Sequence, residues 1–250
     1  MRSINCFLPI ILLFTGITSR AQFAKGDRMV GASVGSVLYN SGSADISVDQ
    51  IGENKSKITS YNLSITPSMG WFISEKTAVG ASLNINPTGN KTSYEQNGAT
   101  YQSDKSNNFN IGLGGFVRHY LKTSGNMFPF GQFGFNLGIS SLKTEGFLYI
   151  GSAPNVTKTT YEGSSSGGFF ANASPQAGFT KMMGENAGLD FFIGYIYGYN
   201  NNTFSKTTLR DIGNNGSIDE TLKNKTTSKY TNHGFLLGVG FQVFLRGKNK

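Results

Sequence analysis

The chain alternates apolar and polar residues over eight separate segments, which is the period of β-strands rather than of helices. In the fourth segment, for example, Phe109, Ile111 and Leu113 share one parity, while Asn110 and Gly112 share the other. Successive side chains of a strand point to opposite faces, so each segment has an apolar face and a face of glycine, small and amide residues. The eight segments cover about residues 29–39, 58–72, 78–87, 107–121, 128–143, 166–181, 188–200 and 229–245.

The connections between these segments alternate in length. Those after the first, third, fifth and seventh segments are long and polar, and they cover 40–57, 88–106, 144–165 and 201–228. Those after the second, fourth and sixth segments are short, and they cover 74–77, 122–127 and 182–187. Short turns on one rim and long loops on the other are typical of transmembrane barrels, and 9–11 residues suffice for a tilted strand to cross. We therefore predict an all-β chain that forms an eight-stranded antiparallel up-and-down transmembrane β-barrel.

Composition and charge favour this barrel over a soluble β-sandwich. Only 14% of the residues are charged, while 33 are glycine and 13% are aromatic. By these strand limits Asp190 is the one acidic residue within a strand, and Arg118 is the one basic residue well inside a strand. Such exclusion of charge is expected where one face meets lipid and the other a crowded lumen. Pro67, Pro129 and Pro175 run against the assignment, because proline weakens a central strand.

The first 21 residues have the organisation of a secretory signal peptide. Arg2 provides a positive start, Phe7–Ile17 is an apolar core, and small residues at Ser19 and Ala21 predict cleavage before Gln22. The barrel domain would then be 22–250. Cleavage removes Cys6, the single cysteine, and two of the 22 basic residues, so the net charge falls from +8 to +6.

Several segments together resemble the small eight-stranded outer-membrane β-barrel proteins of diderm bacteria, the OmpA/OmpX-like or porin-like barrels. The segments that carry the resemblance are 65–73 with 77–83 after a short turn, and 111–120 followed by 129–135. The resemblance is one of pattern over about residues 23–246. It implies a location in the bacterial outer membrane and insertion by the barrel assembly machinery, and it implies no functional residues. The chain departs from the family pattern at its end, where Phe244 is followed by six further residues.

Eight strands leave an interior just wide enough for side chains to fill. The parity of the strands points bulky residues inward, among them Phe72, Phe116 and Phe130, so we expect a packed, closed lumen. Arg118 and Asp190 would both face inward near the periplasmic rim. We predict that they form a lumenal ion pair, because an unpaired charge there would be costly. The alternative is a gating or selectivity charge.

The basic excess favours anionic partners. A nucleic-acid partner is not expected for a chain with a signal peptide. The last long connection and its rim carry Lys206, Arg210, Lys223, Lys225 and Lys229. These residues are candidates for contacts with outer-membrane lipid, in particular the phosphates of lipopolysaccharide. The alternative is that they are ordinary solvated loop charges.

No motif for catalysis, a cofactor or a metal stands out. His119 and His233 are the only histidines, and both have lipid-facing parity. An outer-leaflet lipid-modifying enzyme would need His233 to meet Ser228 or Asp211, and no spacing enforces this. We expect a monomeric, non-enzymatic barrel that stabilises the envelope and presents extracellular loops to lipopolysaccharide or a partner. A narrow porin-like channel for ions or small solutes, and the lipid-modifying enzyme, remain the alternatives.

Overall fold

The computed structural model describes residues 23–48, 52–121, 125–151, 155–165 and 167–247. The expected signal peptide, including Cys6, lies outside the described residues. The described part is almost entirely strand, and none of its segments is a helix long and apolar enough to cross a membrane. Its strands are β1 (Arg28–Val48), β2 (Gly52–Phe72), β3 (Thr77–Gln96), β4 (Ala99–Tyr120), β5 (Met127–Ile150), β6 (Thr157–Ser165), β7 (Gly168–Met182), β8 (Ala187–Ile212) and β9 (Glu220–Leu245).

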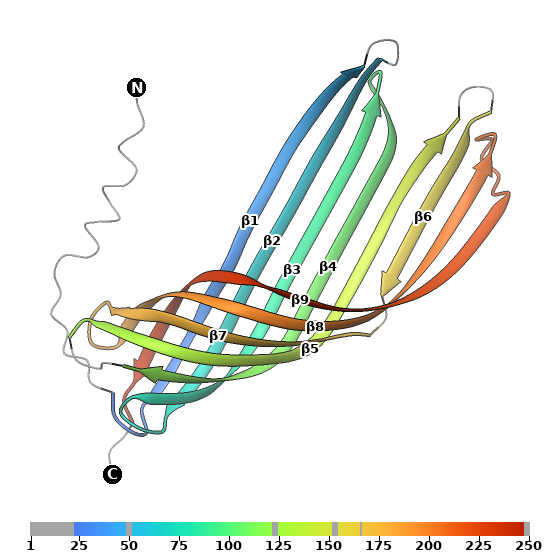
Figure 1. Ribbon diagram of the computed structural model, residues 1–250. Helices are drawn as coiled ribbons and strands as arrows, with labels where there is room; N and C mark the ends of the chain where they lie inside the picture. Colours follow the sequence, from blue (N-terminus) through green and yellow to red (C-terminus); the bar gives the residue numbers. More distant parts are fainter. Residues whose placement is uncertain (1–22, 49–51, 122–124, 152–154, 166, 248–250) are drawn as a thin grey trace, which may run out of the picture.

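The strands pair in an antiparallel ring (Figure 1). Pairing runs in chain order from β1 to β5, continues through β7, β8 and β9, and returns from β9 to β1. β6 and β7 both pair with β5 on one side and β8 on the other, one beyond the other along the same line. They are therefore one strand interrupted after Ser165, and eight strands surround the lumen. The predicted eight-stranded up-and-down fold is confirmed.

The predicted long loops are wrong, because most of their residues continue the strands. The hairpin from β3 to β4 turns only at Asn97 and Gly98, both with positive φ, although residues 88–106 were expected to form a loop. The β6 strand occupies much of the expected loop 144–165. The turns on the other rim are short, as predicted. The extensions escape detection because both of their faces meet water, so no apolar parity marks them.

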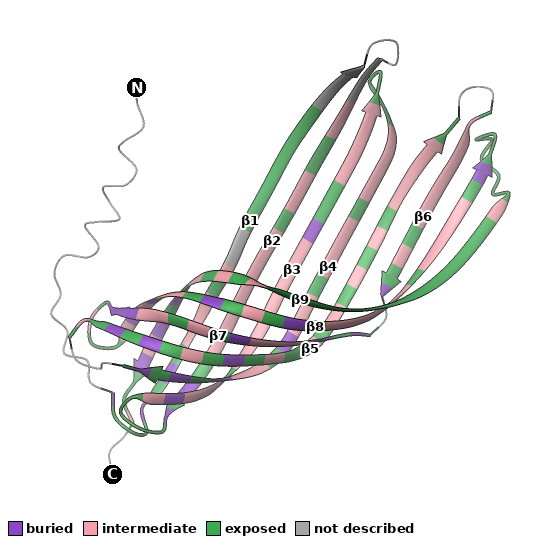
Figure 2. Ribbon diagram, in the orientation of Figure 1, coloured by how far each residue is buried: buried purple, intermediate pink, exposed green. Residues whose placement is uncertain are grey.

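The two faces of the sheet differ as the parity predicts, and Figure 2 shows burial alternating along β5. Apolar side chains cover the outside, where Leu113 is 72% exposed and Phe235 is 83% exposed. An apolar surface that continuous is not tolerated in water and is typical of a lipid-facing band. On β4 the outward apolar residues run from Phe109 to Val117, which is long enough for a tilted crossing. Beyond them the outward positions carry Asn107 and Lys105.

The strand prolines lie where the ladder is interrupted. Pro175 on β7 opposes Phe133 of β5, but the register between β7 and β8 passes from Ala173 to Gln176 without a partner for it. The register between β2 and β3 likewise has no partner for Pro67. Proline lacks the N–H that a ladder bond needs, so each of these prolines pairs with one neighbouring strand and not with the other. This resolves the conflict that the sequence presented.

The seam between β1 and β9 closes only part of the ring. These strands pair over seven positions, from Arg28 opposite Leu245 to Val34 opposite Val239. A bulge at Gly35 follows directly in β1, and a bulge bends a strand and increases its twist. Beyond it β1 stays with β2 and β9 stays with β8, and the two strands diverge (Figure 1).

Candidate functional site

The inward face of the barrel combines rings with the glycines that accommodate them. A Cβ atom at Gly80 would collide with the ring of Phe116, and one at Gly238 would collide with the ring of Phe192. A side chain at either position would displace a ring that lies in the lumen. The inward glycines are therefore the reason that an eight-stranded barrel can hold rings at all.

An aromatic plug closes the lumen at the rim that carries the chain ends. Phe23, which precedes β1, lies at its centre, with ring centroids 4.5 Å from Phe72, 5.0 Å from Tyr120, 5.2 Å from Phe128 and 4.7 Å from Phe244. All five rings are buried. Ring pairs at these separations attract beyond the burial of their area, so the plug is a tightly packed floor.

The segment of Phe23 is held in place by Asp27. One carboxylate oxygen of Asp27 accepts a hydrogen bond from the backbone N–H of Ala24 at 2.8 Å, and the other accepts one from Gly247 at 2.8 Å. The backbone N–H of Gly26 donates to the carbonyl of Phe72 at 2.8 Å. The two ends of the domain are thus joined beneath the floor of the lumen.

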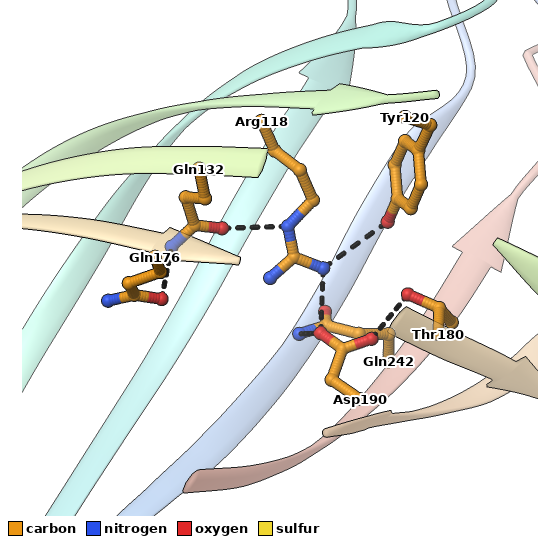
Figure 3. Close-up of polar contacts among 7 residues, drawn as sticks. All are labelled: Arg118, Tyr120, Gln132, Gln176, Thr180, Asp190 and Gln242. Atoms are coloured by element: carbon orange, nitrogen blue, oxygen red, sulfur yellow. Dashed lines mark hydrogen bonds and ion pairs between the residues drawn. The ribbon is translucent and has the colours of Figure 1, made fainter. Parts of the chain in front are cut away.

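A buried ion pair lies beside Tyr120 of the plug (Figure 3). Nη1 of Arg118 is 2.6 Å from Oδ2 of Asp190, and the two side chains are 5% and 1% exposed. The structure thus brings together the two residues that were expected to pair. Arg118 also donates from Nε to Gln132 at 2.7 Å and from Nη1 to the hydroxyl of Tyr120 at 3.2 Å, while its guanidinium lies 4.0 Å from the centroid of the Phe130 ring.

The carboxylate of Asp190 is also satisfied by residues of the two strands that flank β8, namely β7 and β9. Thr180 donates its hydroxyl to Oδ1 at 2.6 Å, and Gln242 donates its amide to Oδ2 at 3.2 Å. The network joins β4, β5, β7, β8 and β9 across the lumen. It leaves the carbonyl oxygen of the Gln242 side chain buried without a hydrogen-bond partner.

Above the ion pair the lumen is hollow, which corrects the expectation that side chains fill it. A cavity of about 720 Å³ is lined mainly by serine, threonine and amide side chains. The inward rings occupy the floor and project from the wall as Phe116, Phe170 and Phe192. Small and medium polar side chains do not reach the axis from the wall, so closure is limited to the rim that holds the plug.

The five basic residues expected in one loop lie on strands and on two different faces. Lys223, Lys225 and Lys229 are exposed on β9 and have the outward parity, opposite the neutral residues Thr207, Ser205 and Asn201 of β8. The three lysines thus form a cationic row above the apolar band.

Lys206 and Arg210 have the opposite parity on β8. The ammonium of Lys206 lies 3.9 Å from the centroid of the Tyr161 ring. Arg210 donates to Glu220 at 2.9 Å. Expecting all five residues at one surface was wrong, because strand alternation separates odd from even positions.

The histidines do not form a catalytic group with the residues considered for them. Nδ1 of His233 is 2.9 Å from the hydroxyl of Tyr195, and Nδ1 of His119 is 3.0 Å from the hydroxyl of Thr77. Asp211 accepts from the backbone of residues 215 and 216. The register puts it near the far tip of β8, about 46 Å along the strand from His233 at roughly 3.3 Å per residue. No group of three or more metal-binding side chains occurs within the described ranges.

The strand extensions carry an exposed ion pair with shifted ionisation. Nζ of Lys105 on β4 is 2.7 Å from the carboxylate of Glu145 on β5. The hydrogen bond between the two side chains, together with the attraction of their opposite charges, lowers the pKa of Glu145 and raises the pKa of Lys105. Both residues lie beyond the apolar band, in contact with water.

Sequence reasoning missed the members of the plug that come from strand ends. Phe128 and Phe244 are off the apolar parity, and both are buried, so their side chains point inward. Phe23 precedes the first predicted strand, so no parity applied to it. The partners of Asp190, Thr180 and Gln242, also have inward parity. Listing inward polar residues at the level of Asp190 would have found them.

Comparison with known proteins gives fold similarity without a family. No family model matches the chain, and neither does any curated protein. The structure is similar to the outer membrane protein OprG of Pseudomonas aeruginosa, at 14% identity and a TM-score of 0.40, covering 90% of this chain and 98% of that one. It is also similar to the outer membrane protease OmpT of Escherichia coli, at 8% identity and a TM-score of 0.34, covering 93% of this chain and 100% of that one.

The translocator domain of the autotransporter NalP of Neisseria meningitidis is a third similar structure. Identity is 10%, the TM-score is 0.22, and 89% of each chain is covered. At these identities the likeness concerns the fold alone, and no residue role is transferred from it.

Proposed function

We propose that this chain is a non-enzymatic outer-membrane barrel protein with a lumen closed at its periplasmic end, which presents cationic strand extensions to lipopolysaccharide. The closed floor is the observation that carries the proposal. The aromatic plug and the Arg118–Asp190 network span the lumen from wall to wall. The floor lies at the rim of short turns, which faces the periplasm in transmembrane barrels.

The lysine row on β9 supports the part of the proposal that concerns lipopolysaccharide. Lys223, Lys225 and Lys229 project outward beyond the apolar band, on the side where the phosphates of an outer leaflet would lie, and Lys229 is the nearest of them to the band. Their neighbours on β8 are uncharged, so nothing on that strand neutralises them. Each basic residue near an anionic surface contributes about 1 kcal/mol at low salt.

The test replaces all three lysines of the row with glutamine. We expect affinity for lipopolysaccharide, measured on refolded protein in nanodiscs, to fall about 100-fold at low salt, since three contributions of roughly 1 kcal/mol are lost. The difference should shrink as salt is added, because exposed charges are screened.

A matched control removes the same charge at the opposite rim by replacing Lys25, Lys76 and Arg246, all exposed, with glutamine. It should bind as the parent does. Equal losses in the two variants would show that net charge rather than the row governs binding, and would refute this part of the proposal.

The cavity favours one competing function, a narrow channel. Its 720 Å³ volume already opens most of the path, so only the floor separates the lumen from the periplasm. Conduction would require the plug and the ion pair to part. Steady ion conductance by the unmodified protein would favour the channel.

A further inference from the structure

The cavity reaches the outside of the barrel through the seam. Its lining includes Ser33 and Gly35 of β1 together with Phe235 and Leu237 of β9. Phe235 and Leu237 belong to the outward, apolar parity of β9, and they are 83% and 70% exposed. These residues lie on the two strand edges just past the last pair of the seam, because β1 and β9 do not pair beyond Val34 opposite Val239.

The mouth of this opening lies within the outer part of the apolar band. Along β9 the outward apolar residues end at Phe235, and His233 with its partner Tyr195 follows. The mouth is therefore level with hydrocarbon rather than with water. A molecule at the mouth would have apolar surroundings outside and the lumen inside.

The lumen behind the mouth is polar, and the charge of Arg118 in its lining is paired with Asp190. A row of amides crosses three strands, in which Asn110 donates to Asn86 at 3.2 Å and Asn86 donates to Asn62 at 3.2 Å. Asn200 donates to Asn232 at 3.2 Å on the other wall. A side-chain amide offers two donors and an acceptor with two lone pairs, so a wall of amides presents both donors and acceptors to the lumen.

We propose that the lumen binds the uncharged, hydroxyl-rich head group of an amphiphile, a saccharide head group, whose hydrocarbon chain leaves through the β1–β9 seam. Hydroxyl groups both donate and accept, which matches a wall of amides and hydroxyls. An anionic head group does not fit, because Arg118 is the only cation among the described residues that line the cavity, and Asp190 already neutralises it. The volume lies within the range of about 300–1,000 Å³ that is usual for small-molecule sites. The inference goes beyond the proposed function and does not depend on lipopolysaccharide binding to the lysine row.

The test uses probes that separate the head group from the chain. The protein is placed in phosphatidylcholine nanodiscs, and the NMR signals of the lumenal asparagine side chains are followed. Dodecyl maltoside, added below the amount that dissolves the discs, should shift these signals. Dodecylphosphocholine, which has the same chain and a charged head, should not, and neither should free maltose.

Each other outcome contradicts the proposal. Equal binding of maltose would make the lumen a site for a free saccharide, with no part for the seam. Equal binding of dodecylphosphocholine would remove selectivity for the head group. An absence of shifts with dodecyl maltoside would show that the lumen is not the site.

Variants locate the binding in the lumen. Replacing Asn86 and Asn110 with alanine should weaken dodecyl maltoside at least about 10-fold, the equivalent of roughly 1.4 kcal/mol of lost hydrogen bonding. Asn224→Ala, on the exposed extension of β9, is the matched control and should bind as the parent does. Leu236→Trp keeps every amide but obstructs the cavity that Leu236 lines, and it should abolish binding. Unchanged binding by both lumenal variants would overturn the assignment.

Discussion

The side chains of Arg118 and Asp190 are both buried, so their response to mutation depends on whether one or both charges are removed. Breaking a buried pair leaves an uncompensated charge, which typically costs about 3–5 kcal/mol. Exposed pairs typically contribute about 0.2–1 kcal/mol. The chain contains both kinds of pair, because Arg210 and Glu220 are about half exposed.

We therefore expect Asp190→Asn to lower the free energy of unfolding by about 3–5 kcal/mol in urea, since Arg118 then lies buried without its counter-ion. Glu220→Gln, which breaks the exposed pair, should cost at most about 1 kcal/mol. The measurement is urea unfolding in micelles, followed by heat-modifiable gel migration. Similar midpoints for the two variants would contradict a structural role for the buried pair.

The Lys105–Glu145 pair gives a pH-dependent prediction outside the membrane. Since the folded pKa of Glu145 lies below its ordinary value of 4.5, the pair stabilises above that value, and its contribution is lost as the pH falls through the lowered pKa. Lys105→Met should raise the pKa of Glu145, measured by carboxyl NMR titration. Lys25→Met, at the opposite rim, should leave it where it is. A titration midpoint that Lys105→Met does not move would show that the ammonium is not the cause.

Within a single strand, the glycines of the inner face are tied to rings on the neighbouring strand. A Cβ at Gly80 on β3 would meet the Phe116 ring and the carbonyl of Met69, whereas one at Gly131 on β5 would meet open space. Gly80→Ala should destabilise the barrel by about 1–3 kcal/mol, the usual cost of overpacking, and Gly131→Ala should be neutral. Urea midpoints compare the two. Equal midpoints would show that the inward rings adapt freely.

The seam predicts a local difference in hydrogen exchange. Beyond Gly35, β1 has a neighbour on one side only, whereas β3 at the same height has β2 and β4. Alternate amides of 38–44, those facing the seam, should exchange much faster than the amides of 88–94, because they have no ladder bond. Uniform protection of both segments would mean that the seam is closed in solution.

The sequence predicts well those features that depend on the alternation of apolar and polar residues. Apolar parity located all eight crossings and the three short turns, because lipid on one side and the lumen on the other impose different residues. Where both faces of a strand meet water, apolar and polar residues do not alternate. The extensions of β3 and β4 were therefore predicted to be loops. The same reasoning explains the misplaced basic residues: Lys206 and Lys225 were treated as loop neighbours, although they lie on strands with opposite parity.

At the scale of the molecule, what the barrel can admit depends on where its lumen is open. The floor is closed by Phe23 and its neighbouring rings, while the wall is open at the β1–β9 seam. Neither feature follows from the sequence pattern. The plug depends on a residue before the first strand, and the seam depends on the register of strands at opposite ends of the chain. Both arise only when the ring forms.

Planar-bilayer recording of the refolded protein tests the closed floor most directly. A variant with Phe23→Ala, Arg118→Ser and Asp190→Ser, whose folding is checked by gel migration, removes the centre of the plug and the ion pair together and serves as the open reference. A closed floor predicts no steady conductance for the parent protein and measurable conductance for this variant. Steady conductance by the parent protein, at the level of the opened variant, would contradict it.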